Sequence, residues 1–258
     1  MKERQNVVVV GLGEVGKPLL ELASKYHNVM GVDLEAPRQR FDKVDVLHIC
    51  FPFEIPGFIG ESARYIELFR PAITIINSTV GVGTTRAIAE RTRTAVVNSP
   101  VRGKHVRMLE ELQHYTKFVG SSDPAAARRA VEHFESMGLK TKILSDSEAT
   151  ELAKLTETTY FGLMIAWAQE VERYCDRAGQ DYVEVVSFYD EIKFFPQVKY
   201  FPGVIGGHCV MPNIEILSKF ENSALLAAIK GSNQEKVARD AGKKQKTEAE
   251  KGSQPVRG

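Results

Sequence analysis

Short apolar runs alternate with stretches of helical periodicity through the first half of the chain. Residues 7–10 are all valine, which is typical of a strand buried on both faces of a parallel sheet. A helical pattern follows, with Leu19, Leu20, Leu22 and Ala23 on its apolar side. Further strands are predicted at 28–33, 44–50, 72–77, 94–98, 117–120 and 141–144, and helices at 58–69 and 124–138. The alternation predicts an α/β fold with a doubly wound parallel sheet of the Rossmann type.

The pattern changes after residue 145. Between residues 146 and 178 the only helix breaker is Gly162, so one helix of about 30 residues is expected. Helices are also predicted at 181–193 and 213–230, on either side of an irregular stretch rich in glycine, proline and aromatic residues. A polar, Lys- and Glu-rich end follows, for which the composition predicts disorder. We therefore predict a Rossmann domain at 1–145, a helical domain at 146–232 and a disordered tail at 233–258.

The first strand runs directly into a G-x-G-x-x-G sequence. Its residues are Gly11, Leu12, Gly13, Glu14, Val15 and Gly16. Gly11 would permit the tight turn, Gly13 the close approach of a pyrophosphate, and Gly16 the packing of helix on strand. The phosphates would lie on the free N–H groups of the helix's first turn. This context indicates a dinucleotide site, whereas the alternative is a strand–turn–helix without a ligand.

Asp33 ends the second strand, where an acidic residue binds the ribose hydroxyls of NAD. A carboxylate repels a 2′-phosphate, so NAD is favoured over NADP, although Arg38 and Arg40 could reverse this preference. Segments at the carboxyl ends of the third and fourth strands are expected to complete the site, namely Pro52, Phe53, Ser78 and Thr79. Thr84 or Thr85 is expected to cap the next helix.

Bulk properties narrow the possible partners. A net charge of +1 gives no electrostatic reason to expect nucleic acid or an anionic membrane, and no metal is expected. The three cysteines are too scattered for a disulfide framework, which indicates a reducing compartment. No apolar run approaches the ~20 residues needed to span a bilayer. We therefore expect a cytoplasmic protein acting on a small molecule.

Two residues outside the nucleotide motif could carry chemistry. Cys209 follows two glycines and His208 just ahead of a predicted helix, a setting that lowers a thiol pKa. The alternative for Cys209 is a small buried apolar residue. Lys154 shares a helix face with Thr158 and could donate a proton or stabilise an oxyanion, although a solvated surface charge is the default for a helical lysine.

Five segments, in order from residue 7 to about 213, resemble the UDP-glucose/GDP-mannose dehydrogenase family, in particular its UDP-N-acetylmannosamine dehydrogenase-like branch. They are the glycine turn, the loop at 77–85, residues 99–102 with 107–112, the segment at 151–155, and the Gly-Gly-His-Cys stretch at 203–209. The resemblance implies oxidation of a sugar C6 alcohol to a carboxylate with two NAD. It implies that Cys209 forms a thiohemiacetal and then a thioester, and that Lys154 stabilises the oxyanion. Thr79 would hold the catalytic water and contact the cofactor.

The chain also departs from the pattern of that family. The family carries glutamates where this chain has Val101 and, in some members, His105. It has an asparagine and an aspartate at the positions of Thr158 and Asn213, which we still place in the candidate catalytic site, and a proline at Gly81. The family's third, nucleotide-binding domain has no counterpart within the 258 residues. General acid–base help, whose loss costs about 10²–10⁴-fold in rate, would therefore be reduced.

Three functions remain open. The first is an NAD-dependent oxidoreductase of this kind, acting on a sugar or a small hydroxy compound and able to stop after one oxidation. The second is an NAD-binding regulatory or assembly protein that has lost the chemistry. The third is a dehydrogenase of the 3-hydroxyacid or prephenate type that uses Lys154. The apolar residues Leu152, Leu155, Leu163 and Trp167 predict a homodimer through the long helix.

Overall fold

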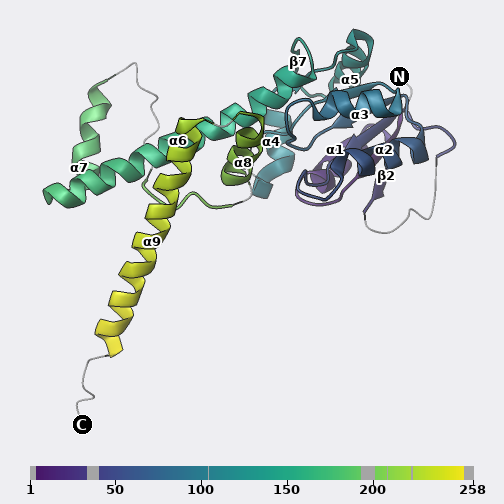
Figure 1. Cartoon of the computed structure of the whole chain (residues 1–258). Coiled ribbons are helices and arrows are strands. Elements are labelled where there is room, and N and C mark those ends of the chain that lie inside the picture. Colours follow the sequence, from purple (N-terminus) through teal and green to yellow (C-terminus); the bar gives the residue numbers. More distant parts are fainter. Residues whose placement is uncertain are drawn as a thin grey trace. The chain divides into compact units, whose positions relative to one another are not determined.

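The computed structural model describes residues 4–33, 41–103, 105–192, 201–207, 209–221 and 223–252 (Figure 1). The chain divides into two compact units, Met1–Lys154 and Leu155–Gly258. Within the described residues, no helix combines the length and the hydropathy needed to cross a lipid bilayer.

The first unit contains a five-stranded parallel sheet in the order β2-β1-β3-β4-β5. Its strands are β1 (Asn6–Val10), β2 (Asn28–Val32), β3 (Val46–Ile49), β4 (Ile73–Ile76) and β5 (Val96–Asn98). Its helices are α1 (Gly16–Ser24), α2 (Phe58–Phe69), α3 (Thr84–Thr92), α4 (Met108–His114), which follows the 3₁₀ turn η1 (His105–Arg107), and α5 (Pro124–Ser136). The predicted α/β fold with a parallel sheet is confirmed.

Two predicted strands do not join this sheet. β6 (Lys117–Val119) and β7 (Thr141–Ile143) pair with each other in a separate two-stranded parallel sheet. One antiparallel bridge, between Asn98 and Gly120, links this small sheet to the end of β5. Short polar strands carry little information on their partners, because the hydrophobic pattern that sets register is absent from them.

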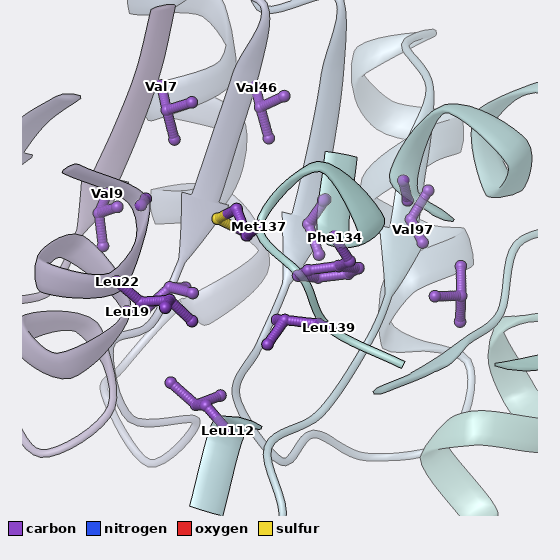
Figure 2. Packing of buried hydrophobic residues seen from close by; sticks show 14 of the residues in the cluster. Val7, Val9, Leu19, Leu22, Val46, Val97, Leu112, Phe134, Met137 and Leu139 are labelled. Carbon is purple, nitrogen blue, oxygen red and sulfur yellow. The ribbon is translucent and has the colours of Figure 1, made fainter. Parts of the chain in front are cut away.

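Strand β1 explains how both faces of the large sheet are buried. Val7 and Val9 face α1, α4 and α5, and Figure 2 shows this side of the core around Phe134, Met137 and Leu139. Val8 and Val10 face α2 and α3 on the opposite side. All four valines are at most 1% exposed. Alternation of side chains along a strand that is covered on both faces requires the continuous apolar run seen in the sequence.

Backbone contacts fix the glycine turn between β1 and α1. Gly11 has φ +87° and donates its N–H to the Val32 carbonyl at 2.8 Å. A Cβ at Gly11 would lie 2.6 Å from the Phe51 nitrogen, and one at Gly16 would lie 1.8 Å from the Gly11 oxygen. A Cβ at Gly13, by contrast, would meet nothing within 4 Å. Gly11 and Gly16 are thus required by the fold, whereas Gly13 borders open space.

The second unit is helical. Helix α6 (Ser147–Ala178) begins in the first unit and continues into the second, followed by α7 (Tyr182–Ser187), the 3₁₀ turn η2 (Phe188–Glu191), α8 (Val210–Phe220) and α9 (Ala224–Gly252). The long helix is as predicted. The single helix predicted at 213–230 is wrong, because the chain leaves helical geometry between α8 and α9. Helix α9 continues to Gly252 and so includes part of the predicted tail at 233–258.

Gly16→Ala and Gly13→Ala should separate the two kinds of glycine. We expect Gly16→Ala to lower the free energy of unfolding by about 2 kcal/mol or more, because its methyl group overlaps the Gly11 carbonyl. Gly13→Ala should change it by less than about 0.5 kcal/mol. Chemical denaturation measures both, and equal losses of stability would contradict the packing described for Gly16.

Candidate functional site

The loops that follow β1, β3 and β4 contact one another at the carboxyl edge of the large sheet. Gly11 lies against the backbone of Phe51, whose carbonyl accepts a hydrogen bond of 2.6 Å from the Ser78 hydroxyl. The Phe53 ring lies beside Gly81, 3.4 Å from where a Cβ would be. Asp33 is exposed directly after β2. The structure therefore brings the candidate cofactor residues to one edge, while Arg38 and Arg40 lie outside the described residues.

Helix α3 is capped by a side chain from a distant part of the sequence. The Glu151 carboxylate accepts hydrogen bonds from the N–H of Gly83 at 2.6 Å and of Thr85 at 2.8 Å. The expected caps, Thr84 and Thr85, are instead the first two residues of the helix, and the N-cap is Gly83. Burial raises the pKa of Glu151 above its ordinary value, and hydrogen bonding by Thr85 and Gly83 opposes this. The positive end of the helix dipole also stabilises a carboxylate at the first N–H groups of α3.

A buried chain of hydrogen bonds crosses the first unit and ends next to this loop. Asn77 Nδ2 lies 3.0 Å from His48 Nδ1, His48 Nε2 lies 2.9 Å from His133 Nε2, and His133 Nδ1 lies 2.7 Å from Gln5 Oε1. Since an amide nitrogen only donates and an amide oxygen only accepts, the chain is directed. His48 carries its proton on Nε2 and His133 on Nδ1.

Burial keeps both histidines neutral. It lowers the pKa of His48 well below its ordinary value, with the charges of His133, Lys117 and His27 acting in the same direction. It lowers the pKa of His133 to about 3. Hydrogen bonds satisfy these rings, which are 0% exposed. The sequence does not reveal this contact, because His48 of β3 and His133 of α5 are 85 positions apart.

Two lysines lie on the same side of the first unit. Lys117 is 3% exposed and its Nζ donates to the Ser99 carbonyl at 2.6 Å and the Pro100 carbonyl at 3.4 Å. Burial lowers the pKa of Lys117 to about 7; the Cys50 thiol opposes this and the charge of Lys154 adds to it. Lys154 on α6 is half-buried and close enough to influence Lys117. Cys50 itself is inert, since burial raises its pKa to about 12.

Val101 follows these carbonyls at the position where the resemblance expects a glutamate. It is 6% exposed and belongs to the apolar core between the sheet and α4. Its N–H donates to the Asn77 carbonyl at 3.2 Å. This position therefore carries an apolar core side chain where the resemblance expects a carboxylate. The side chain of His105 lies outside the described residues.

Cys209 occupies the N-cap position of α8 in the second unit and is partly exposed. This is the setting expected from the sequence, because the dipole of a helix stabilises a thiolate at its N-terminus. Ile205, four residues before Cys209, is held by Asn233 of α9. The Asn233 amide oxygen accepts from the Ile205 N–H at 2.7 Å, and its nitrogen donates to the Ile205 carbonyl at 3.0 Å. His208 lies outside the described residues.

Two further candidate residues contact each other. Asn213 on α8 donates from Nδ2 to the Thr158 hydroxyl on α6 at 2.9 Å. Gly162 makes the crossing of these helices possible, since a Cβ there would lie 2.7 Å from Val210 Cγ1. The one breaker in the long helix is therefore a packing position. Thr158 and Asn213 are hydrogen-bonded in the second unit, whereas Thr79 and Lys154 belong to the first.

The first unit has a Rossmann-type fold, with the glycine turn between its first strand and first helix. Structures with this fold include UDP-D-ManNAc dehydrogenase of Pyrococcus horikoshii, with a TM-score of 0.79 and 20% identity over 92% of this chain and 70% of that chain. Another is 3-hydroxyisobutyrate dehydrogenase of Mycobacterium tuberculosis, with a TM-score of 0.62 and 19% identity over 93% of this chain and 88% of that chain.

Sequence comparison finds similarity to one family over part of the chain. Residues 148–247 match the model of the UDP-glucose/GDP-mannose dehydrogenase family, central domain. It is 25% identical over 281 aligned positions to UDP-N-acetyl-D-mannosamine dehydrogenase of Methanocaldococcus jannaschii, covering 89% of this chain and 65% of the relative. The chain thus spans about two thirds of that relative's length. Dehydrogenases of this family are NAD-dependent, in agreement with the cofactor expected from the sequence.

The buried histidines predict a loss of stability in acid. The unfolded chain binds a proton at the His133 position below about pH 6.5, whereas the folded chain binds it only near pH 3. The free energy of unfolding should therefore fall between these values, by up to about 1.4 kcal/mol per pH unit for His133. His133→Gln should flatten this dependence. Denaturation at several pH values measures it, and an unchanged slope in the variant would contradict a buried neutral His133.

Proposed function

We propose that the chain is an NAD-dependent oxidoreductase that oxidises an alcohol group of a sugar, with nucleotide sugars as the substrate class. Two observations support this proposal. The glycine turn leaves open space at Gly13 where a pyrophosphate would lie, and the region matched by the family contains both Lys154 and Cys209. Names of relatives support the substrate class, since several act on UDP- or NDP-linked amino sugars.

The residues of the turn fit NAD. The N–H groups at residues 13–16 would bind the pyrophosphate at the start of α1, and the exposed Asp33 would accept hydrogen bonds from the ribose hydroxyls. Pro52, Phe53, Ser78 and Thr79 would line the remainder of the site. NAD, when bound, accepts a hydride from the substrate carbon.

Cys209 and Lys154 would carry the chemistry on the substrate. Loss of a hydride and a proton converts the alcohol into an aldehyde. The Cys209 sulfur then adds to the aldehyde carbon, giving a thiohemiacetal whose oxyanion the Lys154 ammonium would stabilise. Transfer of a second hydride, to a second NAD, would leave a thioester, and attack of water would release the carboxylate and the free thiol.

Release of the thioester is expected to be slow. The carboxylates that would activate water are replaced by Val101, which is in the core, and by Asn213, whose amide is bonded to Thr158. Without such a base, hydrolysis loses a factor of about 10²–10⁴. Accumulation of the acyl enzyme on Cys209 follows from this loss.

Two other functions have support from particular observations. The buried Val101 also suits an NAD-binding regulatory or assembly protein without turnover. The fold shared with 3-hydroxyisobutyrate dehydrogenase suits oxidation of a small hydroxy acid with Lys154 in the acid–base role. The match at residues 148–247 favours the sugar dehydrogenase.

We also propose a homodimer through α6. Trp167 is 51% exposed and Leu152 is 39% exposed, and exposed apolar surface on a long helix favours a protein contact. Leu155 contributes nothing to such a contact, because it is fully buried within its own chain.

Mixing the protein with NAD and UDP-N-acetylmannosamine, UDP-glucose or 3-hydroxyisobutyrate tests the proposal. We expect a nucleotide sugar to give a burst of about two NADH per chain, followed by slow turnover and an acyl mass on Cys209. Cys209→Ala should remove the adduct, and Lys154→Met should slow the burst.

Cys175→Ala is the matched control, because it removes another cysteine of the second unit, one that is 4% exposed. It should leave the burst unchanged. A burst with the hydroxy acid alone would favour a dehydrogenase of the 3-hydroxyacid type. NADH binding without reduction of NAD by any substrate would favour the regulatory or assembly protein.

A further inference from the structure

Glu151 is a buried charged residue whose two carboxylate oxygens both bind backbone. It is 1% exposed, and its oxygens accept from Gly83 and Thr85 at 2.6 and 2.8 Å. Burying a carboxylate is costly unless hydrogen bonds compensate for the lost water. The two backbone N–H groups supply this compensation at Glu151.

The two N–H groups that donate hydrogen bonds to Glu151 lie where the loop after β4 meets α3. Residue 83 is the N-cap of α3, and as a glycine with φ +87° it has no side chain that could cap the helix itself. The other end of the same loop is fixed by the Ser78 hydroxyl on the Phe51 carbonyl. Thr79, the candidate cofactor contact, lies between these two anchors.

The carboxylate comes from the first turns of α6. Glu151 is separated from Gly83 by 68 positions in the sequence, so this contact joins distant segments of the first unit. Lys154 is three residues further along the helix, which puts the two side chains on neighbouring parts of one face.

We propose that Glu151 is a positioning residue that holds the loop carrying Thr79 in register with the helical turn carrying Lys154. The inference rests on the proposed function, because it assigns Thr79 to the cofactor. Glu151 touches neither cofactor nor substrate in this role. It acts through the two backbone N–H groups at the start of α3.

Glu151→Gln tests the inference, because the side chain keeps its shape but loses the charge and one acceptor. NADH affinity, measured by titration of the whole chain, should weaken about tenfold in this variant. Glu148→Gln is the matched control, since Glu148 lies on the same helix. Glu148 pairs with the Arg86 side chain at 2.8 Å, whereas Glu151 accepts from the backbone N–H groups of Gly83 and Thr85. Its affinity for NADH should stay within about twofold of the wild type.

A double-mutant cycle separates positioning from general destabilisation. If Glu151 acts through Thr79, Glu151→Gln should change NADH affinity by less than about twofold in a Thr79→Ala background. An equal effect in both backgrounds, or unchanged affinity in Glu151→Gln alone, would overturn the positioning role while the proposed function stands. Absence of NADH binding by the wild type would overturn both.

Discussion

No side chain fits at residue 16, because a Cβ there would lie 1.8 Å from the Gly11 carbonyl oxygen. This close approach decides where α1 begins relative to β1, and the contact of Gly11 with Phe51 ties the same turn to the end of β3. The free N–H groups of α1 consequently point to the carboxyl edge of the sheet. Everything proposed for the cofactor depends on this arrangement of three backbone segments.

Buried polar groups complete the same edge. The Asn77–His48–His133–Gln5 chain fixes the end of β4, and Glu151 fixes the start of α3, so the loop between them is held on both sides. Each hydrogen bond contributes only about 1 kcal/mol net, yet an unpaired buried partner would cost more. Such networks therefore specify one arrangement of the loop.

Local signals in the sequence were sufficient for much of this fold. The valines of β1, the glycine turn, the bounds of α2, the start of α5 and the length of α6 all follow from patterns within a few residues. The position of Cys209 before a helix was also predictable. Glu151 as a cap and His48 as a link were not, because each depends on a partner far away in the sequence. The break between α8 and α9 had no glycine or proline to mark it.

The central claim is that the glycine turn binds NAD, and NADH affinity of Gly13→Val tests it most directly. Residue 13 borders open space, so a valine there should leave folding intact while it occupies the place of the pyrophosphate. Gly60→Val is the control, since Gly60 in α2 also has nothing within 4 Å. The account predicts at least about tenfold weaker NADH binding for Gly13→Val and none of that loss for Gly60→Val. Equal NADH affinity in Gly13→Val and the wild type would contradict it.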